Sequence, residues 1–308
     1  MREEEVDRAI PRSASEEALN PLPIKGIKNL LGFIQEWVRH LGRKPKIGLA
    51  LGSGASWGVA HIGVLSVFKE LNIPISYLSG CSAGSFVGAL YAGGLEGKEL
   101  EDCGIKYGWR EAGRLNYFPK MALATNERMA SYLRKRIGNP DFKDLRLPFY
   151  VVATNLKTGQ MRVFDEGPVV PAVRASCAMP GIYNPVEIDG ELYCDGGVLD
   201  TIPCEILRKA GADLVIAVEL RRTIGKRPTN IFEVISRAFD IAVSCQVVSD
   251  EQASDLMIRP NVNDLNEYEF DLNQNHLLIE RGKQAAHEQL KPWRQQTASA
   301  QPETEQTT

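Results

Sequence analysis

The chain has 308 residues, of which 44% are hydrophobic and 24% are charged, and its formal net charge is -3. These values are typical of a globular protein with a substantial core, and the charge argues against a dedicated nucleic-acid binder, which carries a basic surface. Six scattered cysteines without C-x-x-C pairs or neighbouring histidines indicate reduced thiols rather than a disulfide framework or a zinc site.

The N-terminal residues, 1–20, are polar and charged, and we expect them to be disordered. The first five residues include three glutamates and lack the apolar core of a signal peptide. Nowhere does an apolar run approach the ~18 residues of a membrane-spanning helix. We therefore expect a cytoplasmic protein, either soluble or peripheral on the inner face of the membrane.

Residues 21–44 predict an amphipathic helix. Its apolar residues follow the i, i+3, i+4, i+7 spacing: Ile24, Ile27, Leu30, Leu31, Ile34, Trp37, Val38 and Leu41. The other face is mostly basic. Such a helix either packs its apolar face onto the domain core or, through residues 24–41, lies on an anionic membrane surface.

Residues 45–294 alternate between strand-like and helix-like segments. The expected strands are 47–51, 75–79, 147–154, 160–164 and 212–219, with a hairpin at 186–193. The expected helices are 61–71, 85–92, 202–210, 231–248 and 275–290, and the more helical stretch 96–140 is a candidate cap. This alternation predicts an α/β fold with a mainly parallel sheet covered on both faces. The polar end, 295–308, is expected to be a disordered tail.

A glycine-rich loop, Gly52–Gly58, follows the first expected strand. It does not fit a dinucleotide-binding loop, because the third glycine arrives one residue late and Trp57 stands where that glycine belongs. The Gly-Lys-Ser/Thr of a P-loop is absent. Small residues that expose backbone N–H groups favour an oxyanion hole instead, with Gly52, Gly54 and Ala55 as its candidates. A tight connection without a ligand is the alternative.

The segment Gly80-Cys81-Ser82-Ala83-Gly84 lies between an expected strand and an expected helix. A G-x-S-x-G in this position is a nucleophile elbow, in which small flanking residues allow a sharp turn that exposes the serine hydroxyl. The following helix points its N-terminus towards the place where negative charge would develop. The alternative is that Ser82 merely caps this helix.

No histidine convincingly supplies a base for Ser82. Only His276 and His287 come late enough for the chain order of a conventional triad, and both lie in or near a polar helix. His61 reads as a packed helix residue. Asp195, which follows a short strand and precedes Gly196 and Gly197, is the economical alternative as the direct base, although Asp-Gly is also common in turns.

Four motifs in order make the chain similar to the patatin-like phospholipases: Gly52–Gly58, Gly80–Gly84, Ala175–Pro180 and Asp195–Gly197. The resemblance implies a three-layer α/β/α sandwich with a helical cap over residues 45–294. It implies a Ser-Asp dyad that hydrolyses (lyso)phospholipid or related glycerolipid esters, with Ser82 as nucleophile and Asp195 as proton acceptor. No metal or organic cofactor is implied. The sequence says nothing of the oligomeric state.

Two departures from that family's pattern occur near the site. Trp57 replaces a basic residue in the oxyanion loop, and Cys81 replaces the more frequent threonine. Two alternative functions follow. One is a conventional esterase or acyltransferase that needs a histidine, and the other is a catalytically impaired lipid-binding or regulatory protein.

Overall fold

The computed structural model describes residues 42–117, 121–220, 228–229, 231–244, 253–266 and 271–297. Its strands are β1 (Ile47–Leu51), β2 (Tyr77–Gly80), β3 (Arg114–Leu115), β4 (Ala124–Thr125), β5 (Phe149–Asn155), β6 (Met161–Phe164), β7 (Val186–Ile188), β8 (Glu191–Asp195), β9 (Leu214–Val218) and β10 (Leu256–Ile258). Its helices are α2 (Ala60–Glu70), α3 (Ala83–Ala92), α4 (Gly97–Lys106), α5 (Trp109–Ala112), α6 (Glu127–Ile137), α7 (Val169–Ser176), α8 (Cys204–Lys209), α9 (Ile231–Ser244) and α11 (Leu272–Thr297). Short 3-10 helices are η2 (Ala55–Val59), η3 (Phe142–Asp144) and η4 (Gly196–Val198).

The main sheet has the order β10-β9-β1-β2-β5-β8-β7, and β6 also pairs with β5. The strands from β10 to β5 are parallel, whereas β6, β7 and β8 join by antiparallel pairing. Every residue of β1 and β9 is buried, as expected for central strands of a parallel sheet with both faces covered. The predicted α/β fold with a mainly parallel sheet is confirmed.

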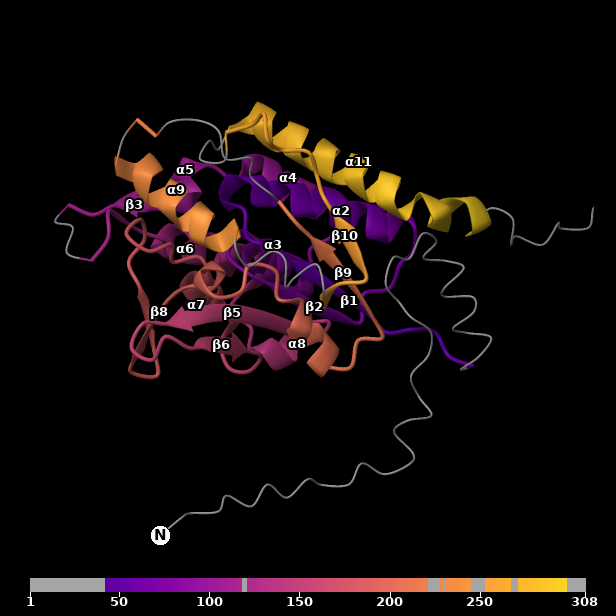
Figure 1. Cartoon of the computed structure of the whole chain (residues 1–308), viewed down its shortest axis with the longest axis horizontal. Helices are drawn as coiled ribbons and strands as arrows, with labels where there is room; N and C mark the ends of the chain where they lie inside the picture. Colours follow the sequence, from indigo (N-terminus) through magenta and orange to yellow (C-terminus); the bar gives the residue numbers. More distant parts are fainter. Residues whose placement is uncertain are drawn as a thin grey trace, which may run out of the picture.

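Helices cover the two faces of the sheet unequally (Figure 1). On one face, α2 packs beneath the long helix α11, with α3 and α4 nearby, around the large core that contains Leu49, Phe68 and Leu90. On the other face, α8 packs against β1 and β9 through a smaller cluster that includes Leu207 and Val215. The expected three-layer arrangement is therefore present.

The expected cap stretch, 96–140, contains three helices, α4, α5 and α6, and also the short antiparallel pair β3–β4, which the sequence pattern did not predict. Helices α9 and α11 differ from the predicted helices at their ends. α9 ends at Ser244, beyond which residues 245–252 lie outside the described part, and α11 starts at Leu272 and continues to Thr297. The segment 1–41 and most of the 295–308 segment also lie outside the described residues, so the predictions on them stay predictions.

β5 brings the ends of two other strands together. β2 runs parallel to β5 and reaches it with Gly80 opposite Val151, whereas β8 runs antiparallel with Asp195 opposite Ala153. Both strands pair with the same side of β5, since β6 pairs with its other side at Val151 and Ala153. The last residues of β2 and β8 therefore meet head to head at the carboxyl edge of β1 and β2, where ligands bind in open α/β sheets.

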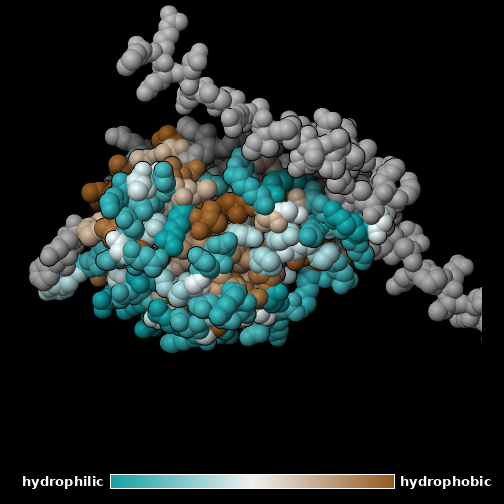
Figure 2. Space-filling view, turned by 90° about the horizontal axis from the view of Figure 1, so that it is seen from below, coloured by the Kyte–Doolittle hydropathy of each residue, from teal (hydrophilic) through white to brown (hydrophobic). Residues whose placement is uncertain are grey.

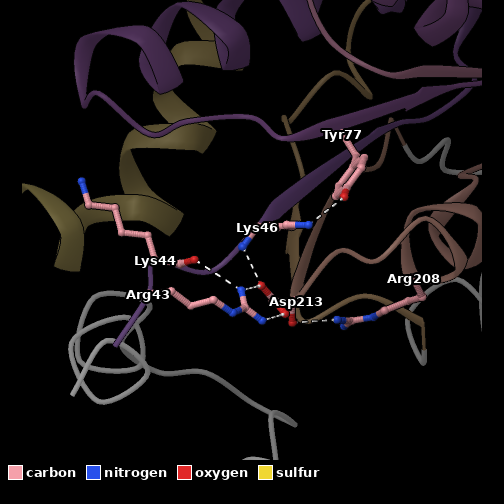
Figure 3. Close-up of polar contacts among 6 residues, drawn as sticks. All are labelled: Arg43, Lys44, Lys46, Tyr77, Arg208 and Asp213. Carbon is pink, nitrogen blue, oxygen red and sulfur yellow. Dashed lines mark hydrogen bonds and ion pairs between the residues drawn. The ribbon is translucent and has the colours of Figure 1, made fainter. Parts of the chain in front are cut away.

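A cluster of ion pairs and hydrogen bonds stands at the opposite edge of the sheet (Figure 3). Asp213 accepts from both terminal nitrogens of Arg43, at 2.5 and 2.9 Å, and from the backbone N–H of Lys46 at 2.7 Å. Arg208 donates to the Asp213 carbonyl at 3.0 Å. These contacts fix the residues just before β1 to the start of β9, at the amino ends of the parallel strands.

Candidate active site

Ser82 lies on a strained turn between β2 and α3. Its φ of 50° and ψ of -122° are unusual for a residue with a side chain, and α3 begins at the next residue. The flanking glycines permit close backbone approach: a Cβ on Gly80 would lie 2.7 Å from the Ser85 backbone, and one on Gly84 would collide with the Leu51 carbonyl. A sharp turn between a strand and a helix is thus present at Ser82, and a side chain at either flanking glycine would clash with the backbone.

Ser82 is hydrogen-bonded to Asp195. The Ser82 hydroxyl donates to Asp195 Oδ2 at 2.7 Å, and the Gly197 N–H donates to Oδ1 at 2.8 Å. The Cys81 Sγ lies 3.9 Å from the same Oδ1. A Cβ on Gly196 would collide with the Val152 carbonyl, so this glycine lets η4 lie directly on β5. The structure therefore brings together Ser82 and Asp195, which are 113 residues apart in the sequence.

Asp195 is almost completely buried, at 2% exposure. Burial raises the pKa of its carboxyl from 3.8 to about 7, and the hydrogen bonds from Gly197, Ser82 and Cys81 oppose this rise. Desolvation penalises the charged form of a carboxyl, which makes the carboxylate a stronger base than an exposed aspartate. A pKa near neutrality is the value that suits a general base.

The segment at the end of α7 contacts both members of this pair. The Ser82 N–H donates to the buried Ser176 Oγ at 2.9 Å, and the Cys177 thiol donates to the Ser82 carbonyl at 3.1 Å. The next residue, Ala178, accepts from the Asp195 N–H at 2.9 Å. These contacts explain the Ala175–Pro180 motif, to which sequence reasoning gave no role of its own. Only the fold could reveal it, since the three residues act through long-range contacts.

The glycine-rich loop lies against the elbow. A Cβ on Gly58 would collide with Ala83, and one on Gly84 would come within 2.6 Å of the Gly52 carbonyl. The Gly52 N–H donates to the Val218 carbonyl at 3.1 Å, so Gly52 anchors the loop and this donor is occupied. Within the described residues, no acceptor takes the N–H groups of Gly54 and Ala55.

Ala55, like Ser82, has a positive φ, of 47°. Among the described residues, the other non-glycine residues with positive φ, Asn72 and Asp189, lie in turns. Such conformations cost about 1–3 kcal/mol each and gather at functional sites, where the surroundings enforce them. Two of them on neighbouring loops mark this edge of the sheet as a built site.

His61 supports the loop and does not contact Ser82. It is fully buried, and its Nε2 donates to the Gly52 carbonyl at 2.8 Å. Burial lowers its pKa to about 4, against a smaller opposing effect of this hydrogen bond, so the ring is neutral at pH 7. His287 lies 3.1 Å from Glu70, and in the described part of the chain no histidine bonds to Ser82.

Trp57 is 3% exposed and belongs to the large core. Its backbone N–H donates to the Gly54 carbonyl at 2.9 Å, closing the turn of the loop through the main chain. The change from a basic residue to tryptophan therefore places an apolar ring in an apolar environment. The shape of the loop is set by backbone contacts that do not require a cation.

The described residues contain no group of three or more His, Cys, Asp or Glu side chains arranged to hold a metal ion. No helix in the described ranges combines the length and apolarity needed to cross a bilayer.

The chain is also similar to known proteins. The chain is 37% identical over 179 residues to an uncharacterised NTE family protein of Mycobacterium tuberculosis, an overlap of 57% of this chain and 49% of that protein. It is 32% identical over 180 residues to the lysophospholipase nte1 of Aspergillus fumigatus, an overlap of 56% of this chain and 12% of that protein. The chain thus spans about half the length of its mycobacterial relatives and a small part of the fungal one. Among solved structures, VipD from Legionella pneumophila matches with a TM-score of 0.47 and 13% identity, covering 81% of this chain and 67% of VipD.

The family model for patatin-like phospholipases matches residues 49–208, just over half of the chain. This range begins within β1, before the glycine-rich loop, and ends within α8, after Asp195. It includes Ser82, Asp195 and the residues that hydrogen-bond to either of them. The chain belongs to the patatin-like phospholipase family.

Proposed function

We propose that the protein is a serine hydrolase that cleaves acyl esters of (lyso)phospholipids or related glycerolipids, with Ser82 as nucleophile and Asp195 as proton acceptor. The observation that carries the proposal is the 2.7 Å hydrogen bond from Ser82 to the buried Asp195. Family membership and the similarity to a fungal lysophospholipase support the choice of substrate class.

In the acylation step, the Asp195 carboxylate accepts the Ser82 proton as Oγ attacks the ester carbonyl. The developing oxyanion is stabilised by the N–H groups of Gly54 and Ala55, each worth ~3 kcal/mol in the transition state. Collapse of the intermediate breaks the ester bond, and Asp195 returns the proton to the leaving alcohol oxygen. An acyl-enzyme on Ser82 remains.

In the deacylation step, Asp195 accepts a proton from water, whose oxygen attacks the acyl carbonyl. The fatty acid leaves, and the proton returns to Ser82 Oγ. Gly197 holds Asp195 in place throughout, since its N–H bonds the carboxyl oxygen that does not face Ser82. Ser176 and Cys177 act as positioning residues, because they bond the backbone of Ser82 and not its hydroxyl.

The alternative of a histidine-dependent esterase has less support. His61 uses its Nε2 on the Gly52 carbonyl and is kept neutral by burial. The alternative of an impaired lipid-binding protein rested on Trp57, whose ring lies in the core while main-chain bonds keep the loop turn. We retain both as outcomes of the experiment below.

The experiment measures fatty-acid release from lysophosphatidylcholine and from diacyl phosphatidylcholine by the wild type and by Ser82→Ala, Asp195→Asn and Ser131→Ala. Ser131 is an exposed serine of α6 and serves as the matched control. We expect the first two variants to lose roughly a thousandfold in kcat and the control to match the wild type. Turnover that survives Ser82→Ala would overturn the proposal. Turnover that survives Asp195→Asn would favour the histidine-dependent esterase, and the absence of turnover from the wild type would favour the impaired lipid-binding protein.

A further inference from the structure

The solvent-facing side of α9 is apolar. Ile231, Val234 and Ile241 are exposed at 70%, 51% and 47%, while the polar Ser236 of the same helix is fully buried. Ala238 and Ala242 are also exposed. An ordinary surface helix presents its polar residues to water and buries its apolar stripe. Because α9 has the reverse orientation, we infer that its exposed apolar face is covered when the protein functions.

The inner side of α9 lies beside the candidate active site. A Cβ on Gly197 would lie 3.3 Å from the Phe239 ring, and one on Gly181 would lie 3.4 Å from Ile235. Gly197 itself donates to Asp195, so α9 lies beside a residue that directly contacts the Ser82–Asp195 pair. Helix α9 therefore borders the site, and its exposed apolar residues lie on the side of the helix that faces solvent.

The β3–β4 hairpin extends this apolar surface. Leu115, Tyr117 and Met121 are exposed at 80%, 91% and 56%. The hairpin is joined to the α9 region through one segment, since the Leu123 N–H donates to the carbonyl of Gly181 at 3.1 Å. Figure 1 places β3, α5 and α9 at the same end of the molecule, and Figure 2 shows hydrophobic surface towards that end of a largely hydrophilic face. We call the six exposed residues the apolar rim: Leu115, Tyr117, Met121, Ile231, Val234 and Ile241.

Positive charge accompanies the apolar rim. Arg110, Arg114 and Arg128 are all exposed, and Arg114 immediately precedes Leu115. Arg128 reaches the Arg110 carbonyl at 3.5 Å, so these two lie together. Apolar side chains next to clustered arginines suit an anionic lipid surface, where apolar groups enter the acyl boundary and cations meet the headgroups.

The N-terminal connection lies on the opposite side of the domain from the candidate active site. Arg43, which is bonded to Asp213, stands at the amino ends of β1 and β9 (Figure 3). Ser82 and Asp195 stand at the opposite, carboxyl ends of the strands. The chain that precedes Arg43 thus joins the domain at the edge opposite the site. Helix α9, which carries part of the apolar rim, borders the site instead.

We propose that the apolar rim docks onto an anionic phospholipid bilayer and so brings Ser82 close to its lipid substrate. This inference rests on the proposed function, because docking serves to bring Ser82 to a lipid substrate. The docking itself is tested without turnover, so the two can fail separately.

The first test is sedimentation with vesicles of equal parts phosphatidylglycerol and phosphatidylcholine. The variant Val234→Glu/Ile241→Glu carries two charges on the apolar rim, and Leu277→Glu, on α11 at a residue exposed at 41%, is the matched control. Each rim substitution should weaken vesicle binding about tenfold, and Arg110→Gln/Arg114→Gln should weaken binding and reduce its salt dependence. Hydrolysis of a soluble short-chain ester should stay at the wild-type level in all of them.

The second test avoids added charge. The wild type already contains four tryptophans, so each variant is compared with it. Relative to the wild type, Val234→Trp should show an additional blue shift of its emission when anionic vesicles are added, and Leu277→Trp should show none. A wild type that does not bind vesicles, or rim variants that bind as the wild type does, would overturn the proposal. Rim variants that change the molar mass in light scattering but leave vesicle binding intact would also overturn it, by assigning the rim to contact between copies. Vesicle binding without ester hydrolysis would instead overturn the proposed function alone.

Discussion

Asp195→Asn should raise the stability relative to wild type at high pH while it lowers the activity. The reason is that the substitution removes a buried titrating carboxyl and keeps its shape. Burial raises the pKa of Asp195 in the folded protein to about 7, whereas the unfolded carboxyl titrates near 3.8. As pH rises from about 4 to about 7, the unfolded chain loses this proton while the folded chain keeps it. The contribution of Asp195 to the free energy of unfolding therefore falls over that window.

The magnitude follows from the two pKa values. At about 1.4 kcal/mol for each pH unit over which the two states differ by one proton, the free energy of unfolding of Asp195→Asn relative to wild type should rise by about 3 kcal/mol between about pH 5 and about pH 8.5. The comparison with the variant is needed, because His61 acts in the opposite direction. Its lowered pKa, about 4, makes the folded state lose stability as pH falls below 6.5.

The assay is urea unfolding of both proteins at the two pH values, with Asp213→Asn as the control. Although burial acts in the other direction, the hydrogen bonds from Arg43 and Lys46 lower the pKa of Asp213. Both states of Asp213 are therefore ionised over this range, and its variant should differ from wild type by a constant amount. An Asp195→Asn difference that is equally constant would refute the raised pKa and the account of the buried base.

Three further predictions concern the site. Because the base must be a carboxylate, kcat/KM for a soluble ester should fall about tenfold for each pH unit below about 7, and a flat profile down to about pH 5 would contradict Asp195 as the base. His61→Gln should keep most of the activity, because its amide can still donate to Gly52. His61→Leu should lose about 1–3 kcal/mol of the free energy of unfolding in urea. A thousandfold loss of turnover in His61→Gln would favour a histidine-dependent triad instead. Gly84→Ala should cost roughly 3 kcal/mol or more and abolish turnover, since its Cβ collides with the Leu51 carbonyl, and wild-type unfolding would show that the elbow tolerates a side chain.

Local patterns were enough to predict the parts of the site that depend on neighbouring residues. Gly80 and Gly84 around Ser82 indicate a sharp turn between a strand and a helix, and the structure has that turn. The sequence could also single out Asp195, by its position between a strand and two glycines. In both cases the signal in the sequence comes from residues next to one another in the chain, although the contacts that the structure adds, such as Gly84 with Leu51 and Asp195 with Ser82, are long-range.

Long-range contacts set what could not be predicted. The meeting of β2 and β8 depends on antiparallel entry of β8 along the edge of β5 that β2 also uses, and no periodicity encodes it. The hydrogen bond from the Gly52 N–H to Val218 is likewise a contact between the residue that follows β1 and the last residue of β9, which are far apart in the sequence. The pattern of 231–248 predicts an amphipathic helix, but which face meets water is decided by the surface on which α9 packs.

The most direct test of the central claim is intact-protein and peptide mass spectrometry after treatment with a fluorophosphonate. We predict one adduct, on the peptide that contains Ser82, formed by the wild type, strongly slowed in Asp195→Asn and absent from Ser82→Ala. An adduct on another residue, equal labelling of Ser82→Ala, or no labelling of the wild type would contradict the assignment of Ser82 and Asp195 as nucleophile and base.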